Sequence, residues 1–566
     1  MAVPSKKWQL PPPVKSHGLP VDLPAAAIQV LLSRGIDNRE KLQFFLEPPH
    51  RLPHDPLRLP DMDRGIRRLY QAVSRKETVG IFGDFDVDGL TGTAIIAEGL
   101  ASLDVPVVPY LPKRMGEGHG LSNAAIQHMV QQGVTLVVTV DCGVDAVAEV
   151  SEAHRLGADV IITDHHLPPA VLPDAEAVIN PKLPGASYPF PELCGAGLAF
   201  KLIQGLYEYY GQPWDPSLLE LAALATIADL VPMVDENRYL VTEGLKVMAH
   251  TERPGLQALF RRARVDQQSL NAQTVAFQIS PRLNSAGRMS HAMEAFRLLT
   301  TKSLEEADSL ADRLELLNQE RRTLSERAIS AALDQVQRRS EAGDLPPILL
   351  VWDDCITPGV AGLVAGRLVD LYHRPAVAMS ADGDHLVASA RGIPEFNLVE
   401  AFSACDGYLV RYGGHAQAAG FTIARENLPR LTEDLTAYAQ SKLGSLDLSP
   451  TLAIDATVAL DELTDGLIQW LQELEPYGPA NPLPVFLTLG VPVSEVHYMG
   501  QSRQHLRLVV GDGDGGGRWT ALAFNQADKW VENTKRLDLV YSITDDTWRG
   551  RGAHALRVLD FRPAQG

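Results

Sequence analysis

The sequence predicts an α/β fold in which a parallel-sheet domain is joined by a long helix to a second α/β domain, followed by a C-terminal OB-like β-barrel. Apolar, β-branched runs at residues 78–83, 136–140 and 160–163 are typical of strands buried in a parallel sheet. Residues 303–341 are rich in Leu, Glu, Arg and Gln without Pro or Gly, which predicts the long helix. Short alternating strands with Gly-rich turns after residue 452 predict the barrel.

The first domain alternates strand-like and helical segments, which is typical of βαβ units. Two further short strands are expected at residues 105–110 and 177–179. Helices are expected at residues 90–102, 123–132, 146–156 and 218–227. Because parallel strands deliver their last residues to one edge, the side chains that follow these strands are expected to meet there.

The second domain is expected to contain a strand at 347–352, a helix at 360–372 and a strand at 376–379. Barrel strands are expected at 506–510, 520–524 and 537–543, with a Gly-rich turn at 511–517. The predicted domains are an N-terminal segment (1–60) packing on the first domain, the first domain (61–302), the connecting helix (303–342), the second domain (343–446) and the barrel (447–566).

Composition describes an ordinary globular protein, with 45% hydrophobic and 21% charged residues in 566. The four cysteines form no CxxC pair, so neither a disulfide framework nor a structural zinc site is indicated. No apolar stretch has membrane length, and the protein is expected to be cytoplasmic. The formal charge of −19 argues against nucleic-acid binding over the whole surface, but it leaves room for a local basic groove.

Acidic and imidazole residues follow each of the three apolar runs. Asp84, Asp86 and Asp88 follow the first run, Asp141 follows the second, and residues 164–166 (DHH) follow the third. On an extended strand end, alternate acids share a face, and Gly89 and Gly92 would then permit a tight turn into a helix. So many carboxylates in one place repel one another, and bound cations would relieve that repulsion.

Hard oxygen ligands with one or two imidazoles suit Mn²⁺ or Mg²⁺ better than Zn²⁺. Two such ions, about 3.5–4 Å apart, clamp the attacking and leaving oxygens of a phosphoryl displacement. An acidic turn or a calcium loop are the alternatives for the DxDxD pattern alone. The calcium loop is disfavoured, because no Glu stands at its twelfth position.

Several motifs together resemble the DHH phosphoesterase superfamily. They are GDFDVDG (83–89), VDCG (140–143), DHH (164–166), TIADLVP (226–232), PRLNSAGR (281–288), GGHAQAAG (413–420) and PYGPANP (476–482). The second domain then resembles the DHH-associated domain. Their order over nearly the whole chain is similar to that of the superfamily's large single-strand-specific 5′→3′ DNA exonucleases, which carry a C-terminal barrel.

The resemblance implies a set of metal ligands and catalytic residues. Asp84, Asp86 and Asp141 would hold one ion, and Asp88, Asp141, His165 and Asp229 the other. His166 would face the scissile phosphate, and Asp164 would orient the histidine pair. Asp141, Asp164, His165 and His166 are therefore the predicted catalytic residues, and a water activated by the ions would be the nucleophile.

The resemblance also implies a set of DNA-binding residues. Arg114, Ser389 and Arg391 would hold the 5′ phosphate, because a guanidinium donates to phosphate in pairs. Arg282, Asn284 and Arg288 would line the strand path, and Gly414 and His415 would lie near phosphates. In the barrel, Trp548 and Arg549 are the expected contacts, whereas Trp519 and Phe524 are expected in the core. Without the motifs, each lone Arg would be taken as a solvated surface charge.

The function that the resemblance implies is metal-dependent degradation of single-stranded DNA, 5′→3′, to nucleoside 5′-monophosphates, in recombination and DNA repair. It also implies cooperation of a monomer with single-strand-binding protein and a RecQ-type helicase. A DHH phosphodiesterase acting on short oligonucleotides or cyclic dinucleotides is one alternative, although it would have little use for a barrel. A non-catalytic single-strand-binding replication subunit is another, although such relatives lose the acids that are all present here.

Overall fold

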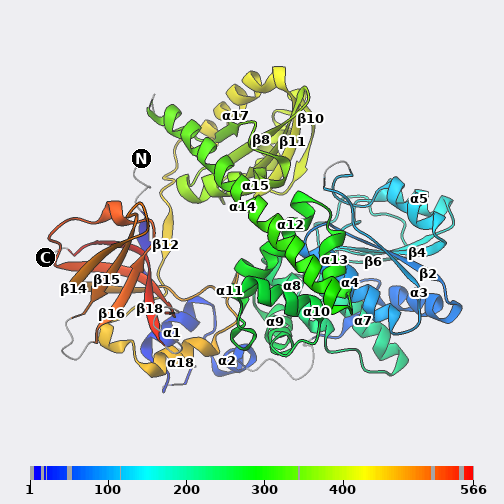
Figure 1. Ribbon diagram of the computed structural model, residues 1–566, viewed down its shortest axis with the longest axis horizontal. Coiled ribbons are helices and arrows are strands. Elements are labelled where there is room, and N and C mark those ends of the chain that lie inside the picture. The colour runs from blue at the N-terminus through cyan, green and yellow to red at the C-terminus, as the bar shows by residue number, and fades with distance from the viewer. Residues whose placement is uncertain are drawn as a thin grey trace. The chain divides into compact units, whose positions relative to one another are not determined.

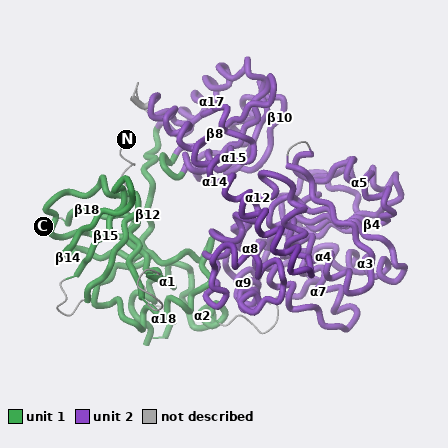
Figure 2. Tube along the Cα trace, in the orientation of Figure 1, with its two compact units in different colours: residues 1–47, 370–373, 445–566 green, residues 48–369, 374–444 purple. Residues whose placement is uncertain are grey.

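The computed structural model describes residues 6–13, 18–20, 22–46, 54–114, 117–341, 345–511, 517–546 and 553–564. The chain divides into two compact units (Figure 2). The larger unit takes in residues 48–369 and 374–444, and the smaller one takes in residues 1–47, 370–373 and 445–566. Among the described residues, no helix combines the length and the apolar character that crossing a membrane requires.

A five-stranded parallel sheet forms the centre of the first domain (Figure 1). Its strand order is β3-β2-β4-β5-β6, with β3 Val107–Tyr110, β2 Thr78–Gly83, β4 Val134–Val140, β5 Asp159–Thr163 and β6 Ala177–Ile179. Every neighbouring pair is parallel, as the apolar runs predict.

Two hydrophobic cores cover the two faces of this sheet. Val138 packs in the core shared with helices α3 (Met62–Arg75), α4 (Val87–Ala101) and α7 (Gly195–Tyr210). Its neighbour Val137 packs in the other core, with α5 (Asn123–Gln131) and α6 (Val147–Arg155). Successive strand residues point to opposite faces, so a sheet covered on both sides requires a continuous apolar run.

Helices complete the first domain and lead out of it. These elements are η1 (Pro56–Arg58), α8 (Leu218–Ala228), α9 (Asp235–Met248), α10 (Pro254–Ala263), η2 (Gln267–Ser269), α11 (Ala272–Thr274), the π-helical η3 (Val275–Ile279), α12 (Ser280–Met289) and α13 (Met293–Thr300). The buried Arg253 joins α4 to α8, because its guanidinium donates to Glu98 and to Glu220. The long helix that the sequence predicts is α14, Leu304–Glu341.

The second domain is a five-stranded mixed sheet of order β10-β11-β9-β8-β7. Its elements are β7 (Leu349–Trp352), α15 (Pro358–Tyr372), β8 (Ala376–Asp382), β9 (His385–Arg391), α16 (Leu398–Ser403), η4 (Asp406–Tyr408), β10 (Leu409–Gly414), β11 (Ala418–Ala424), η5 (Arg425–Asn427) and α17 (Leu428–Leu443). Only β7 and β8 pair in parallel, and the remaining pairs are antiparallel.

The smaller unit contains the predicted barrel. The strands are β13 (Ala456–Thr457), β14 (Phe486–Met499), β15 (His505–Val510), β16 (Trp519–Ala523), β17 (Arg536–Asp545) and β18 (His554–Pro563), with η6 (Leu460–Glu462), α18 (Asp465–Glu473) and η7 (Ala527–Lys529) between them. The long β14 pairs with both β15 and β17, which closes the sheet on itself. Closure removes the sheet edges, as in an OB-fold barrel.

Up to Leu46, the described part of the N-terminal segment belongs with the barrel and not with the first domain. Helices α1 (Ala25–Ser33) and α2 (Arg39–Leu46) place Leu31 and Phe45 in the barrel's hydrophobic core. Strand β1 (Lys7–Gln9) pairs in parallel with β12 (Thr451–Ala453). This differs from the expectation for residues 1–60, because the apolar faces of these helices are buried by barrel side chains.

Candidate metal centre and nucleic-acid site

The ends of three parallel strands place three aspartates side by side. Gly83, Val140 and Thr163 are partners in register, and an aspartate follows each of them. The N–H of Asp84 donates to Val140 O (3.3 Å), and that of Asp141 donates to Thr163 O (3.0 Å). The N–H of Asp164 donates in turn to Ile179 O (3.2 Å). The backbone therefore holds all three acids at the carboxyl edge of the sheet.

The alternation of acids in the GDFDVDG motif predicts an extended strand end, but the structure differs. Strand β2 ends at Gly83, and α4 begins at Val87. Asp86 is the N-cap, and its Oδ1 accepts the N–H groups of Asp88 (3.0 Å) and Gly89 (3.3 Å). Asp88 therefore lies in the first turn of the helix. The same pattern is compatible with a strand end and with a helix N-terminus, because an N-cap acid followed by a second acid two residues later also gives alternation.

Gly89 and Gly92 lie inside α4 and do not form a turn. A Cβ on Gly89 would come within 2.4 Å of the Asp84 backbone, and one on Gly92 within 2.4 Å of Val140 Cγ1. The two glycines therefore let α4 approach β2 and β4 closely. This close approach places Asp86 and Asp88 beside the strand ends.

Asp88 is almost completely buried, at 1% exposure, and is fixed by a second helix. Its two carboxylate oxygens accept the N–H groups of Gly195 and Ala196, each at 2.7 Å, at the start of α7. A helix N-terminus favours negative charge there. Burial nevertheless raises the pKa of Asp88, and the neighbouring charge of Asp86 raises it further.

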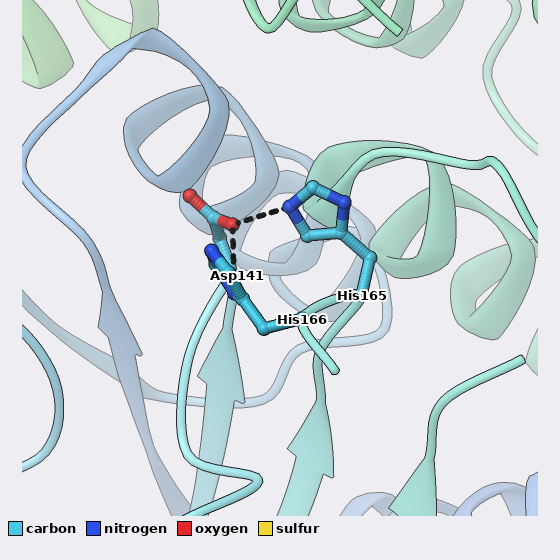
Figure 3. Close-up of side chains that lie close together, drawn as sticks. All are labelled: Asp141, His165 and His166. Carbon is cyan, nitrogen blue, oxygen red and sulfur yellow. Dashed lines mark hydrogen bonds and ion pairs between the residues drawn. The ribbon is translucent and has the colours of Figure 1, made fainter. Parts of the chain in front are cut away.

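Figure 3 shows the carboxylate of Asp141 close to both His165 and His166. His165 Nε2 is 3.0 Å from Asp141 Oδ1, and 3.8 Å from both Asp88 Oδ2 and Asp229 Oδ2. Asp229 arrives from another element, since it is the C-cap of α8. Asp141 adopts a left-handed backbone with φ of 62°, a costly conformation for a residue with a side chain. Strand ends and a helix end thus converge on one centre.

His166 is positioned by its neighbour Asp164. The Asp164 Oδ1 atom lies 2.8 Å from His166 Nδ1 and accepts the backbone N–H of His166 at 3.0 Å. Asp164 Oδ2 accepts the N–H of Val144 (2.9 Å), so the carboxylate itself is anchored. This hydrogen bond to the carboxylate of Asp164 is the main reason why the pKa of His166 is raised.

Potential ligand atoms gather in groups whose members lie within 4.8 Å of one another. The groups are Asp84, Asp86 and Asp141; Asp88, His165 and Asp229; and Asp141, His165 and His166. We call the five carboxylates Asp84, Asp86, Asp88, Asp141 and Asp229 the acidic cluster. The first group has the same members as one ligand set implied by the motifs. The second contains three of the four members of the other set, and Asp141 lies 3.0 Å from its His165.

The electrostatics of the acidic cluster fit divalent cations. Burial raises the pKa of Asp141 well above its usual range, and the neighbouring carboxylates raise it further. Burial, followed by the charge of Asp88, raises the pKa of Asp229 to about 8. Asp84 Oδ1 is buried and has no hydrogen-bond partner among the described residues. Oxygen ligands with a buried imidazole are the donors that Mn²⁺ and Mg²⁺ take in proteins.

Four partly buried arginines from different elements form a second cluster. We call Arg114, Arg288, Arg321 and Arg391 the arginine cluster. Burial lowers the pKa of Arg288 to about 10, and the charges of Arg114, Arg321 and Arg391 add to this. The sequence does not predict a role for Arg321 on α14, because nothing distinguishes it from the other charged residues of this long helix. Its Nε is buried and has no hydrogen-bond partner in the described structure.

Ser389 and Arg391 lie on strand β9. Being two residues apart, they point to the same face of the sheet. A Cβ on Gly362 of α15 would come within 3.1 Å of both Ser389 Oγ and Arg391 Nη2. The small glycine therefore leaves room for the two side chains above α15.

The α12 residues have different environments from one another. Arg288 Nη1 donates to Gly359 O at the start of α15 (3.1 Å), so it bridges the two domains. Arg282 is tied down within the fold, because its Nε donates to Glu315 of α14 (2.6 Å). Asn284 Oδ1 accepts the N–H of Val87 at 3.2 Å, at the first residue of α4. The structure thus gives Asn284 a contact with the metal-centre helix.

Gly414 and His415 reach the metal centre from the second domain. Gly414 ends β10 with φ of 127°, and His415 opens the turn to β11. The ring of His415 stacks on that of His166, with centroids 5.8 Å apart and planes at 6°. The histidine of the second domain therefore lies directly beside the DHH motif of the first.

The aromatic and basic residues of the barrel fall into two groups, those inside and those outside the described residues. Trp548 and Arg549 lie outside the described residues. Trp519 packs against the barrel core but is only partly buried. Phe524 is 48% exposed and is not a core residue, which differs from the expectation. Phe524 follows β16 directly, where the strand pattern alone does not tell the last inward residue from the first outward one. Tyr498 is also exposed, with Arg503 Cζ 4.7 Å from its ring centroid.

The fold and the acidic cluster together define a DHH-type phosphoesterase. The family model for the DHH family, N-terminal domain, matches residues 78–226, and the DHHA1 domain matches residues 346–441. The RecJ OB domain matches residues 454–560. The chain belongs to the RecJ family of single-stranded-DNA-specific exonucleases.

Relatives match nearly the whole chain. The single-stranded-DNA-specific exonuclease RecJ of Bacillus subtilis is 34% identical over 98% of this chain and 70% of its own length. The Dickeya dadantii RecJ is 32% identical, covering 96% of this chain and 97% of the relative. The crystal structure of Thermus thermophilus RecJ with Mn²⁺ has a TM-score of 0.83 at 29% identity, covering 99% of this chain and 80% of that one.

Proposed function

We propose that this chain is a metal-dependent exonuclease that degrades single-stranded DNA 5′→3′ to nucleoside 5′-monophosphates. The observation that carries the proposal is the convergence of two ligand groups on Asp141 and His165 at the sheet edge. All relatives named above are single-stranded-DNA-specific exonucleases, and crystal structures of the Thermus enzyme were solved with Mn²⁺ and with Mg²⁺. The same two cations fit the donor set here.

We assign Asp84, Asp86 and Asp141 to one ion and Asp88, Asp141, His165 and Asp229 to the other. When bound, the ions lower the pKa of a water and stabilise charge on the phosphoryl oxygens. Burial lowers the pKa of His165 to about 4, so its imidazole is neutral at pH 7 and has a lone pair to offer. The protein holds these ligands before any ion arrives, through the backbone contacts of Asp84, Asp88 and Asp141.

His166 faces the scissile phosphate in this proposal. Asp164 accepts from Nδ1, so the proton stays on that nitrogen and Nε2 remains for the substrate. Because Asp164 raises the pKa of His166, the imidazolium form is favoured and Nε2 can donate to a phosphate oxygen. His415, stacked on the same ring, limits the orientations that His166 can take.

The arginine cluster supplies recognition of the strand end. We propose that Arg114, Ser389 and Arg391 hold the 5′ phosphate, since a bound anion would relieve the mutual repulsion of the arginines. Arg288 and Arg282 would line the path of the following nucleotides with Asn284, and Gly414 would offer its backbone to a phosphate. Trp548 and Arg549 are assigned to the barrel's strand contact on sequence grounds alone.

The biological setting completes the proposal. A nuclease that requires a single strand depends on other proteins to expose it. We therefore propose that the chain acts as a monomer in the cytoplasm, with single-strand-binding protein and a RecQ-type helicase, in recombination and DNA repair. A pull-down with each purified partner tests this, and no retention of either would remove the partner assignment.

One digestion experiment tests the enzymatic function. Strands labelled at either end are incubated as single strand or blunt duplex, with Mn²⁺ or with chelator. We expect mononucleotides released first from the 5′ end of the single strand, and none with chelator. Cleavage of short oligonucleotides alone, or equal rates on blunt duplex, would contradict the proposal.

A further inference from the structure

The strand β6 also ends at the catalytic edge, and it brings residues that the sequence patterns do not single out. Thr163 of β5 and Ile179 of β6 are partners in register, so Asn180 lies beside Asp164. Asn180 is fully buried at 0% exposure. Its Nδ2 donates to His166 O (2.9 Å), and its Oδ1 accepts the N–H of Lys182 (2.8 Å). One side chain thus links the backbone of His166 to that of Lys182.

Lys182 is a half-buried cation at this edge. Its side chain is 23% exposed, and its Nζ lies 3.7 Å from Glu192 Oε2, which is longer than a hydrogen bond. Glu192 is itself 45% exposed, so water weakens the pairing. In the described structure the ammonium donates no hydrogen bond to a protein group. Its donors are therefore available to a ligand.

The charge of Lys182 reaches groups from both domains. Burial is the main reason for the lowered pKa of His165 and of His415, and Lys182 lowers each further. Lys182 also opposes the rise that burial causes in the pKa of Asp229. These groups come from the loop after β5, from the β10–β11 turn and from the C-cap of α8. The ammonium therefore acts on His165 and His415. The ring centroids of these two histidines lie 4.7 Å and 5.8 Å from that of His166, where the scissile phosphate is assigned.

We propose that Lys182 is a further catalytic residue, whose ammonium contacts a non-bridging oxygen of the scissile phosphate. This inference rests on the proposed function, because it needs a phosphodiester beside His166. Charge accumulates on the phosphoryl oxygens during displacement, next to five carboxylates that repel it. A lysine suits this place, because a compact ammonium on a flexible stem acts as a point charge.

A structural role is the competing explanation for the same residue. In that case the Lys182–Glu192 pair would tie the β6 loop to the segment before α7. Glu192 is already anchored by its backbone, since its carbonyl accepts from Asn237 Nδ2 (2.7 Å). A structural pair predicts equal losses from removing either partner, whereas a catalytic lysine predicts a loss from one side only.

The test compares Lys182→Met, Lys182→Arg and Glu192→Gln in digestion of a 5′-phosphorylated strand. We expect Lys182→Met to lower kcat by about 10²–10³-fold, the usual effect of removing one charge-stabilising donor, with KM little changed. Lys182→Arg should recover part of kcat, and Glu192→Gln should match the wild type. Lys246→Met, which removes a surface lysine paired with Glu243 at 2.8 Å, is the matched control and should leave kcat unchanged.

Two further measurements keep the outcomes separate. Melting temperatures and metal-free strand binding by fluorescence anisotropy should be the same for Lys182→Met and wild type. Wild-type kcat in Lys182→Met, or equal losses in Lys182→Met and Glu192→Gln, would overturn the inference while leaving the proposed function standing. A wild-type enzyme that leaves the strand intact would overturn both.

Discussion

The acidic cluster and the arginine cluster lie in the same unit. Each one gathers buried or partly buried side chains of a single charge, negative in the first and positive in the second. In the acidic cluster, burial and like charges raise the pKa values of Asp141 and Asp229. In the arginine cluster, burial and like charges lower the pKa values of Arg288 and Arg391. Each cluster is thus destabilised in its charged form until a ligand of opposite charge arrives. This difference in sign is why the proposed function places cations at the sheet edge and the 5′ phosphate between the arginines.

The charges of the two clusters also act on one another, which matters for how a strand end would be recognised. The charges of Asp84 and Asp86 oppose the fall in the pKa of Arg114 that burial causes, and Asp86 does the same for Arg288. An end phosphate held by the arginines would therefore lie close to the metal centre. In the proposed function, this proximity would let the enzyme remove one nucleotide at a time from the phosphorylated end.

The largest expected effect comes from the centre of the acidic cluster. Asp141→Asn should lower kcat by at least about a thousandfold, beyond the 10–100-fold loss typical of a residue that only orients a ligand. The amide keeps the size of the side chain but removes the charge that the two proposed ion sites share. Single-turnover digestion measures kcat, and calorimetric titration with Mn²⁺ should show weakened binding.

Asp145→Asn is the matched control for this variant, because Asp145 is exposed four residues further along the same loop. It should leave both kcat and Mn²⁺ binding unchanged. A fully active Asp141→Asn would remove the acidic cluster as the site of chemistry.

The next effect tests the other side of the comparison. Arg391→Met should lower kcat/KM on 5′-phosphorylated strands by about 10–150-fold, the equivalent of a charge-assisted hydrogen bond of about 1.5–3 kcal/mol. On strands with a 5′ hydroxyl the loss should be small, because the contact is already absent. Arg367→Met changes an exposed arginine of α15 and should lower neither rate. An equal loss on both substrates would move Arg391 from end recognition to the strand path.

Without bound metal, repulsion within the acidic cluster should make the stability of the folded protein depend on pH. The pKa of Asp229 is raised to about 8 in the folded protein. A raised pKa contributes stability at low pH that is lost as pH rises from about 4 to about 8. We therefore expect metal-free Asp229→Asn to gain in melting temperature over wild type as pH rises through this range.

Mn²⁺ should reverse the same strain in the wild type. At a free concentration one hundred times the Kd, binding stabilises the fold by about 2.7 kcal/mol. This stabilisation should grow with pH, since protonated carboxylates must release protons before they bind the ion. Thermal unfolding from pH 5.5 to 8.5 measures both effects. A wild type and an Asp229→Asn variant that respond identically to pH would argue against the raised pKa.

The sequence predicts the acidic cluster far better than the arginine cluster, and the reason is topological. In a parallel sheet every strand ends at the same edge, so Asp84, Asp141 and Asp164 can be brought together from the apolar runs alone. Arg321 and Arg391 come from a long helix and from a mixed sheet, where the chain order does not tell which side chains meet. Motif resemblance supplies Arg391, and nothing in the helical pattern supplies Arg321.

Local signals were ambiguous where two structures share one pattern. Alternating acids at 84, 86 and 88 fit a strand end, but the structure uses Asp86 as the N-cap of α4. Lys182 and Asn180 follow a strand of three residues, which is too short to draw attention to what comes after it. Residues 1–60 carry amphipathic helices, and periodicity alone does not say which core buries their apolar face.

Substitution of Asn284 is expected to have the smallest effect. It is also the most discriminating test, because sequence and structure give this residue different roles. The motif assigns Asn284 to DNA, whereas its Oδ1 accepts the N–H of Val87 between Asp86 and Asp88. Asn284→Ala should cost about 1 kcal/mol of unfolding free energy, as loss of a helix cap does. It should lower kcat by about tenfold through displacement of the two aspartates, below the hundredfold that a 1 Å shift can cause.

The KM for the strand separates the two roles. A helix-capping Asn284 leaves KM unchanged, because the strand loses no contact, whereas a DNA-binding Asn284 raises KM with little loss of stability. Ser122→Ala is the matched control, since Ser122 Oγ caps α5 by accepting the N–H of Ala125 at 3.2 Å. That variant should lose similar stability at unchanged kcat. A raised KM in Asn284→Ala at wild-type melting temperature would return this residue to the DNA path and detach it from the acidic cluster.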